Sequence, residues 1–175
     1  LGEGTYVPGE PIVGEFNDDE TALSWAVIWE RGDRESINES YVNLIPTLQG
    51  GTHVSGMRTG ITDAIKEFCD YRKLLPKGVK LTPDDVWKNC SYILSAKLKD
   101  PQFTGQTKEK LSSKDFQNIA TSITKDSFSI WLNQETQAAE EIAFLCIENA
   151  QARARASQKV ERKKITKGIT LPGKL

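Results

Sequence analysis

Alternating hydrophobic and polar residues predict strands in the first half of this chain. The strongest pattern covers 20–30, where four large apolar side chains fall on one face: Leu23, Trp25, Val27 and Trp29. Turn-forming residues occupy 31–34, and 36–45 has the pattern of a second strand. We therefore expect 20–30 and 36–45 to pair as a hairpin. A further strand is expected over 92–98.

The first residues lack such a pattern. Residues 1–10 carry three glycines and a proline, so 1–15 is expected to be an irregular lead-in, with at most a short edge strand over 11–16. The chain does not begin with methionine, which indicates a fragment or a processed protein. Its first residues do not resemble a signal peptide, because they are neither basic nor apolar.

Apolar residues at helical spacing predict a long helix that begins at Thr52, a good N-cap residue, and ends near Pro76. Its expected buried stripe is Val54, Met57, Ile61, Ala64, Ile65, Phe68 and Tyr71. Thr82 and Pro83 predict the capped start of a short helix that ends at about Asn89.

Two more helices are expected after 92–98. The first covers 113–132, with an inward face of Phe116, Ile119, Ile123, Ile130 and Trp131. The second, rich in alanine, covers 137–164, and its polar last turns are expected to project from the domain. Strands with interspersed helices indicate a two-layer α+β domain, with the helices on one face of the sheet.

Composition is that of a soluble globular protein, with 38% hydrophobic and 27% charged residues. No apolar run approaches the roughly 18 residues of a membrane span. The three cysteines, Cys69, Cys90 and Cys146, form no C-x-x-C pair. We expect buried thiols in a cytoplasmic protein, without disulfides or a zinc site.

A net charge of −1 hides a strong asymmetry. Residues 151–175 hold a single acid, Glu161, and eight basic residues: Arg153, Arg155, Lys159, Arg162, Lys163, Lys164, Lys167 and Lys174. The tail therefore stands at +7 and the preceding body at −8. Two interpretations stay open, a helix that contacts nucleic-acid phosphates and a solvated helix that links domains.

Few residues outside the tail form a recognisable chemical site. The spacing of Gly51 and Gly56 matches a phosphate-binding P-loop, but Met57 and Arg58 stand where that motif needs lysine and a hydroxyl residue. The glycines are therefore expected to form a strand-to-helix turn. His53 is the only histidine and lacks a motif partner, so we expect it to cap or pack. No metal site is assigned.

The polar loop 100–111 is the strongest candidate site. It lies between a predicted strand and a predicted helix, and it supplies an amide at Gln106, a hydroxyl at Thr107 and a cation at Lys108. A lysine ammonium is a compact charge on a long stem, suited to a phosphate oxygen. Taken alone, a lysine in a polar loop is more often a solvated surface residue.

Several segments resemble one family. The run 40–53 contains Asn-Leu-Ile-Pro and ends in Gly-Gly-Thr-His, 100–108 contains Gly-Gln-Thr-Lys, and 171–175 reads Leu-Pro-Gly-Lys-Leu. In this order they are similar to the second half of the ATPase region of bacterial type IIA DNA topoisomerase B subunits. The segments 43–46 and 74–81 are closer to topoisomerase IV than to gyrase. The resemblance covers nearly the whole chain.

The resemblance implies a fold like the second domain of ribosomal protein S5, with a mostly antiparallel or mixed sheet backed by helices and a long basic C-terminal helix. It divides the chain into a transducer domain over 16–150 and a helix and linker over 151–175 that lead towards a TOPRIM domain. A GHKL-type ATP-binding domain would precede the transducer. ATP and Mg²⁺ would be bound mainly there, so this fragment alone is expected to be inactive.

In such a subunit Lys108, with Gln106 and Thr107, would contact the terminal phosphate of ATP and couple its hydrolysis to DNA strand passage. Expected partners are DNA, the topoisomerase IV A subunit in a heterotetramer, and a second B subunit paired through the ATPase domain. The residues expected to contact DNA are Arg58, Arg153, Arg155, Arg162, Lys163 and Lys164.

Two alternatives remain open. One is the same segment of the gyrase B subunit. The other is an S5-like module that binds nucleic acid and has no nucleotide role; the position of the aromatic residues on core faces, away from the basic ones, argues against it.

Overall fold

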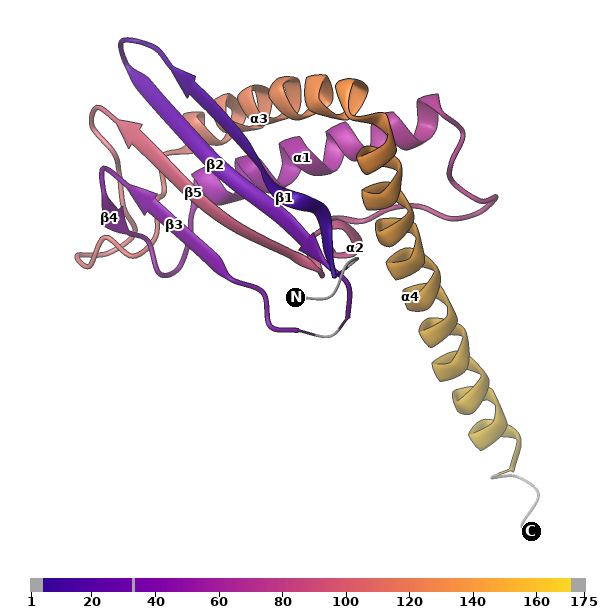
Figure 1. Ribbon diagram of the computed structural model, residues 1–175. Coiled ribbons are helices and arrows are strands. Elements are labelled where there is room, and N and C mark those ends of the chain that lie inside the picture. Colours follow the sequence, from indigo (N-terminus) through magenta and orange to yellow (C-terminus); the bar gives the residue numbers. More distant parts are fainter. Residues whose placement is uncertain (1–4, 33, 171–175) are drawn as a thin grey trace.

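The computed structural model describes residues 5–32 and 34–170, with side chains described up to Lys164. Its centre is a five-stranded mixed sheet in the order β1-β2-β5-β3-β4 (Figure 1). The strands are β1 (Tyr6–Asn17), β2 (Thr21–Glu30), β3 (Asn38–Val42), β4 (Ile45–Pro46) and β5 (Cys90–Leu98). Neighbouring strands pair antiparallel, except that β3 and β5 run parallel.

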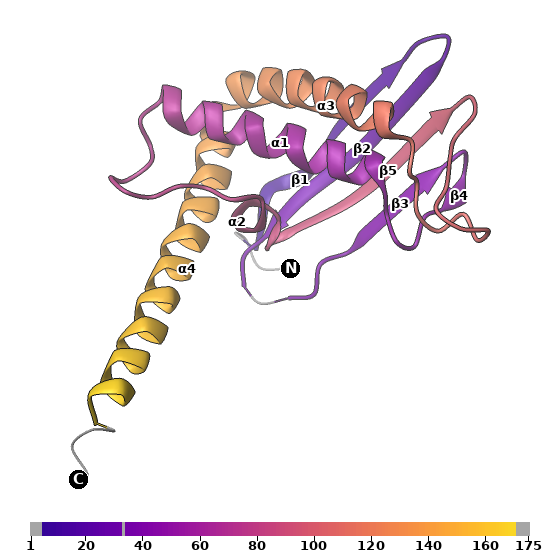
Figure 2. The same ribbon diagram turned by 180° about the vertical axis from the view of Figure 1, so that it is seen from behind.

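The helices are α1 (Thr52–Tyr71), α2 (Pro83–Trp87), α3 (Lys114–Gln134) and α4 (Thr136–Thr170). Helices α1 and α3 lie side by side across one face of the sheet, and α4 leaves the end of α3 and extends away from the body (Figures 1 and 2). The predicted arrangement of a sheet with helices on one face is confirmed. Across the described residues, no helix has both the length and the apolar content of a membrane span.

The core lies between the sheet and helices α1 and α3, and the buried apolar residues in the first half of α4 belong to it as well: Ala139, Ile142, Ala143, Leu145, Cys146, Ile147 and Ala150. The expected inward face of β2 is confirmed, since Leu23, Trp25, Val27 and Trp29 are all buried. The indole Nε1 of Trp29 donates to the carbonyl of Val86 at 2.7 Å, which satisfies the buried donor. The cysteines are free and buried, as expected, and burial raises the pKa of the Cys69 thiol to about 11.

The expectation of an irregular lead-in is wrong for residues 6–10, whereas the short edge strand expected over 11–16 is confirmed; residues 1–4 lie outside the described residues. Residues 6–17 together form β1, an edge strand paired with β2. The register shifts between Val7 and Ile12, and the prolines and a glycine fall within this irregular part. An edge strand tolerates proline because one side of its backbone needs no ladder partner. Val7 and Ile12 are both buried, so the strand is anchored in the core at either side of the shift.

The expected hairpin between 20–30 and 36–45 is also wrong. Strand β2 pairs with β1 and β5, whereas β3 pairs with β5 and with β4. Residues 36–45 hold β3, a two-residue turn at Asn43 and Leu44, and the start of β4. Alternation identifies a strand but not its neighbour, and the connection after β2 is too long to act as a tight hairpin turn.

The helix predictions need three corrections. Thr52 is the first residue of α1, and Gly51 occupies the N-cap position without a side-chain hydrogen bond. Tyr71, expected in the buried stripe of α1, is 88% exposed. Ile119 and Ile130, expected on the inner face of α3, are exposed; the residues of α3 that are buried are Phe116, Ala120, Thr124, Phe128 and Leu132. By contrast, Thr82 caps α2 and Pro83 is its first residue, as predicted, and Asp85 completes a capping box with Thr82.

Close contact between α1 and α3 explains the small residues on their shared faces. A Cβ atom on Gly56 would lie 2.6 Å from the carbonyl oxygen of Gln117, and one on Gly60 would lie 2.6 Å from that of Thr121. Both distances are too short for real side chains. The glycines therefore set how closely the two helices approach, and hence how both cover the sheet.

We predict that Gly60→Ala lowers the free energy of unfolding by about 1–3 kcal/mol, because the added methyl overpacks the interface with α3. Alanine is otherwise favoured over glycine in a helix by about 1 kcal/mol, so the expected sign is opposite to that of helix propensity. Chemical denaturation measures the change. Thr59→Ala, at the exposed neighbour in the same helix, should be neutral or stabilising. A Gly60→Ala protein as stable as the unaltered one would contradict this view of the interface.

Candidate functional site

The base of the 100–111 loop is fixed to the start of α1 by backbone hydrogen bonds. The N–H of Leu111 donates to the carbonyl of Gly50, and the N–H of Thr52 donates to the carbonyl of Leu111, each at 3.0 Å. Beside this pair, the N–H of Gln49 donates to the carbonyl of Glu109 at 2.8 Å, and the Gln49 amide donates to the Glu109 carboxylate at 3.0 Å. The loop base is therefore a rigid extension of the domain.

Gly50 and Gly51 make this attachment possible. Their φ angles are 71° and 136°, a region of backbone space that favours glycine. A Cβ atom on Gly51 would overlap the backbone of Leu111. The predicted glycine turn between a strand and a helix is confirmed, and its close approach to a second segment is a further reason for glycine here.

Above the base, the loop folds back on itself. The N–H of Thr104 donates to the carbonyl of Lys110 at 2.9 Å, and the N–H of Ser112 donates to the carbonyl of Gln102 at 2.8 Å. The N–H of Gln102 also donates to Ser113 Oγ at 2.9 Å. These bonds form a short stem, and residues 105–108 form its tip.

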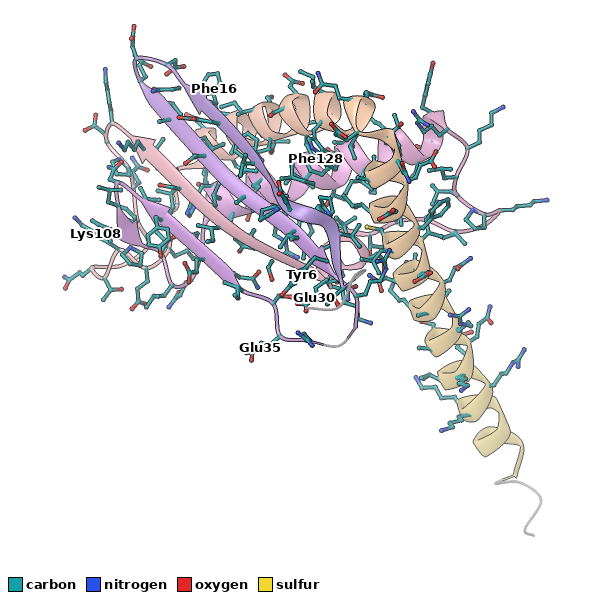
Figure 3. All side chains as sticks on the ribbon, in the orientation of Figure 1. Tyr6, Phe16, Glu30, Glu35, Lys108 and Phe128 are labelled. Atoms are coloured by element: carbon teal, nitrogen blue, oxygen red, sulfur yellow. The ribbon has the colours of Figure 1, made fainter. Side chains whose placement is uncertain are left out.

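The three predicted site residues lie together on this tip. Gln106, Thr107 and Lys108 are all exposed, and Lys108 has a φ angle of 50°, which is uncommon for a residue other than glycine. Figure 3 places Lys108 at the end of the molecule remote from α4. In the part of the chain that the structure describes, no acceptor is paired with its ammonium group. Its three donors therefore remain available for an acceptor outside the domain.

His53 lies in the core and not at a reactive surface. Its side chain is fully buried, and Nε2 is 3.1 Å from the hydroxyl of Thr47, which is in turn 2.7 Å from that of Ser40. Burial lowers the pKa of His53 to about 4, so the imidazole is neutral at physiological pH. The expected packing role of His53 is confirmed.

Arg58 and Arg153, two of the residues predicted to contact DNA, meet at a cavity of about 500 Å³ between α1, α2 and α4. The Arg58 guanidinium lies 5.7 Å from the ring centroid of Trp87 and 3.9 Å from the carboxylate of Asp84. Arg58 is thus held by an aromatic face on α2, with its side chain 41% exposed.

Arg153 has an internal partner. It donates from Nε to Oδ1 of Asp85 at 3.1 Å and from Nη2 to the carbonyl of Lys80 at 3.2 Å. Burial would raise the pKa of Asp85, but hydrogen bonds from Arg153 and Thr82 outweigh burial and lower it. Asn149, one turn before Arg153, adds a hydrogen bond to the Asp85 carbonyl at 2.9 Å. These contacts anchor the middle of α4 to α2.

The remaining predicted DNA contacts, Arg155, Arg162, Lys163 and Lys164, are exposed along the distal part of α4. They are brought together on the distal part of α4, which extends away from the end of the molecule where Lys108 lies (Figure 3). Lys167, in the same basic tail, lies where only the backbone is described.

Sequence reasoning did not find the anchoring role of Asp85 and Asn149. Asp85 fits a capping box by itself, and nothing in the local pattern shows that a residue 68 positions away pairs with it. No group of three or more His, Cys, Asp or Glu side chains that could hold a metal ion occurs among the residues described.

Comparison with known proteins places the chain in a family. Residues 3–162 match the family model described as DNA gyrase B, and the chain belongs to that family. It is 54% identical over 169 residues to the B subunit of DNA topoisomerase 4 from Salmonella typhimurium, a match that covers 97% of this chain and 27% of that protein. The chain thus spans little more than a quarter of that relative's length.

Two solved structures are also similar to this chain. The topoisomerase IV ATP-binding domain of Francisella tularensis, in complex with a small-molecule inhibitor, matches with a TM-score of 0.78 and 42% identity, over 85% of this chain and 41% of that one. The 43K ATPase domain of Thermus thermophilus gyrase B, in complex with an aminocoumarin, matches with a TM-score of 0.78 over 89% of this chain and 43% of that one. At 23% identity, the second likeness concerns the fold alone.

The buried, neutral state of His53 generates a pH prediction. Because its pKa is about 4 when folded and near 6.5 when unfolded, the unfolded chain binds a proton first as pH falls. Stability from this residue is full above pH 6.5 and declines down to about pH 4. We expect the free energy of unfolding at pH 5 to be about 2 kcal/mol lower than at pH 7.

Urea denaturation at both pH values measures this difference. His53→Gln removes the only imidazole in the chain, and this variant should lose most of the decline between pH 7 and pH 5. An equal decline in His53→Gln would assign the effect to other groups and contradict the prediction.

Proposed function

We propose that this chain is the transducer segment of a type II DNA topoisomerase B subunit of the topoisomerase IV kind. In this proposal, Gln106, Thr107 and Lys108 sense the terminal phosphate of an ATP molecule bound by another domain. The supporting observation is the geometry of Lys108, an exposed cation with no partner among the described residues, at the tip of a loop whose base is fixed to α1. The domain order and the likeness to ribosomal protein S5 domain 2 remain part of the proposal.

ATP and Mg²⁺ would be held mainly by a GHKL-type domain outside this chain. In support, the chain covers only 41% of a solved chain whose name describes a topoisomerase IV ATP-binding domain. This segment would then contribute Lys108 and its neighbours to a nucleotide site in another domain, and would hydrolyse no ATP by itself. The full subunit would act on DNA with an A subunit in the cytoplasm, and would pair with a second B subunit through the ATPase domain.

The energetics suit a switch of limited strength. A hydrogen bond from a charged donor contributes about 1.5–3 kcal/mol, which corresponds to roughly a ten- to hundredfold change in population. The bond between Lys108 and the terminal phosphate exists only before that phosphate leaves. Hydrolysis therefore removes a contact between two domains and allows them to rotate.

A continuous set of contacts leads from the loop towards α4. The loop base is bonded to the first turn of α1, and the indole Nε1 of Trp87 on α2 donates to Thr62 of α1 at 3.1 Å. Asp85 of α2 then binds Arg153 of α4. A rotation of the loop would thus move α4 as part of the same rigid body, which favours a transducer over an isolated nucleic-acid-binding module.

The alternatives are weaker but distinct. The same segment of the gyrase B subunit has the same fold, and the 54% identity to a topoisomerase 4 relative favours the topoisomerase IV kind. For the module without a nucleotide role, stacking aromatics would be expected beside the basic residues. Trp25 and Trp29 are buried in the core, and Trp87, although it lies against Arg58, is buried as well and leaves no open ring face for a base.

We predict that Lys108→Ala in the full-length subunit lowers ATP turnover by about ten- to hundredfold, because the terminal phosphate loses a charged donor in the closed state. Steady-state ATPase assays and strand-passage assays measure the effect. The matched control is Lys110→Ala, which removes an exposed lysine from the stem of the same loop. Normal turnover in Lys108→Ala, or an equal loss in Lys110→Ala, would remove the sensor role.

The basic part of α4 is proposed to contact DNA phosphates without reading sequence. We expect replacement of Arg155, Lys163 and Lys164 by Gln in the full-length subunit to weaken DNA binding. The slope of log K against log salt should fall by about 0.9 for each phosphate that the protein no longer neutralises. Arg153 is left intact because Asp85 depends on it. Fluorescence anisotropy across a salt series measures both quantities.

A control with the same change in charge is available in β5, just after β5 and at the start of α3. Lys97, Lys99 and Lys114 are exposed and lie outside α4. Their replacement by Gln should leave DNA binding close to that of the unaltered protein. Equal losses in the two triple variants would show a general charge effect and would dismiss α4 as the DNA-binding element.

A further inference from the structure

The turn between β3 and β4 combines two unfavourable features at one place. Asn43 and Leu44 form its two-residue loop, with φ angles of 51° and 67°. Asn tolerates this left-handed conformation, but a leucine there is an outlier. The same segment also exposes large apolar side chains: Leu44 is 75%, Leu48 81% and Ile45 38% exposed.

The turn is rigid in spite of its strained backbone. The Asn43 amide donates to the carbonyl of Leu98 at 3.1 Å, and its Oδ1 accepts from the N–H of Leu98 at 2.9 Å. The Asn43 N–H donates to the carbonyl of Ala96 at 2.8 Å. We call residues 43–48 the leucine turn. It is held in a fixed shape that presents leucine outward.

The leucine turn is attached to the base of the Lys108 loop. Gln49 follows it directly and is bonded through its backbone and its side chain to Glu109, the residue after Lys108. Figure 1 shows β4 beside this loop at the same end of the domain. A partner that contacts the Lys108 ammonium is therefore close to the leucine turn as well.

We infer that the leucine turn docks against the nucleotide-binding domain of the same subunit, next to the phosphate that Lys108 contacts. This inference rests on the proposed function, because that domain is what brings the phosphate. Several adjacent exposed apolar residues on a strained, fixed turn are typical of an interaction surface, whereas scattered ones are not. The polypeptide for this partner exists in a relative: more than half of the solved topoisomerase IV chain lies outside the match.

The two contacts differ in chemistry and form together in the closed arrangement. The bond to Lys108 requires the terminal phosphate, and the apolar contact adds stability to the same arrangement. The leucine turn would therefore determine how favourable the closed arrangement is, and Lys108 would make that arrangement depend on the nucleotide. Loss of the apolar contact reduces the population competent for tight nucleotide binding, which weakens the apparent affinity by the same factor.

The test uses the full-length subunit and a non-hydrolysable ATP analogue. In the double variant Leu44→Asn and Leu48→Asn, asparagine suits the left-handed position, so the turn is expected to fold. We expect the apparent dissociation constant for the analogue to rise at least about tenfold, because less apolar surface is buried on closure. Tyr71→Asn, at an equally exposed aromatic residue at the end of α1, is the control and should bind normally.

A second measurement needs no variant. Hydrogen exchange of the amides of 44–49 in the unaltered protein should slow when the analogue binds. Unchanged exchange there, or normal affinity in the double leucine variant, would overturn the inference. A dimer that forms without nucleotide and dissociates in the double variant, detected by sedimentation, would also overturn it in favour of a second copy as the partner.

The outcomes separate this inference from the proposed function. A loss of turnover in Lys108→Ala with no effect of the leucine changes would leave the sensor and remove the docking surface. Weakened analogue binding in the double leucine variant with a normal Lys108→Ala would support docking and contradict the sensor.

Discussion

The contact between the backbones of Gly51 and Leu111 is the constraint on which the candidate site depends. It fixes a loop that follows β5 to the first turn of α1, two segments that are 60 residues apart in the chain. Only glycine can occupy position 51, because its φ angle is 136° and any Cβ would overlap Leu111. Without this contact, the tip that carries Lys108 would be a mobile surface loop with no defined direction.

Glycine also permits close packing further along α1. Gly56 and Gly60 let α3 approach closely, so α1 is supported over much of its length by a second helix. The start of α1 is therefore held by the loop base, and the helix from Gly56 onward is held by α3. Under the proposed function, this support explains how a contact at Lys108 could rotate the whole domain and not only move the loop.

The attachment of α4 to α2 is the second constraint on the structure. Asp85 has a side chain that is 3% exposed, and it accepts hydrogen bonds from the cap of its own helix and from Arg153. A half-exposed arginine paired with a buried carboxylate fixes direction more than it adds stability. The basic distal part of α4 thus leaves the body along a defined line, and Arg153 is better explained by this anchor than by a DNA contact.

The sequence predicted what local patterns control. The alternation in β2 identified its buried face, and Thr82 with Pro83 identified the start of α2, because both features depend on residues close in the chain. Partners across the sheet were not predictable, since β2 pairs with β1 and β5 by contacts that alternation does not encode. On α3, Ile119 and Ile130 were expected inside, but the close approach of α1 turned Ala120 and Thr124 inward instead.

For the candidate site, the residue types at 106–108 indicate an anion contact. The resemblance to a family then implies which anion, the terminal phosphate of ATP. The rigidity of the loop base could not be predicted, because it comes from pairing with Gly50 and Thr52. The leucine turn could not be recognised as a surface from the sequence either. Leucine is ordinarily a core residue, and only the fold leaves Leu44 and Leu48 exposed.

The most direct test is a crystal structure of the full-length subunit with a non-hydrolysable ATP analogue. The account predicts that Nζ of Lys108 lies about 2.7–3.0 Å from an oxygen of the terminal phosphate. A Lys108 side chain directed into solvent, with the phosphate bound wholly by residues outside this chain, would contradict it.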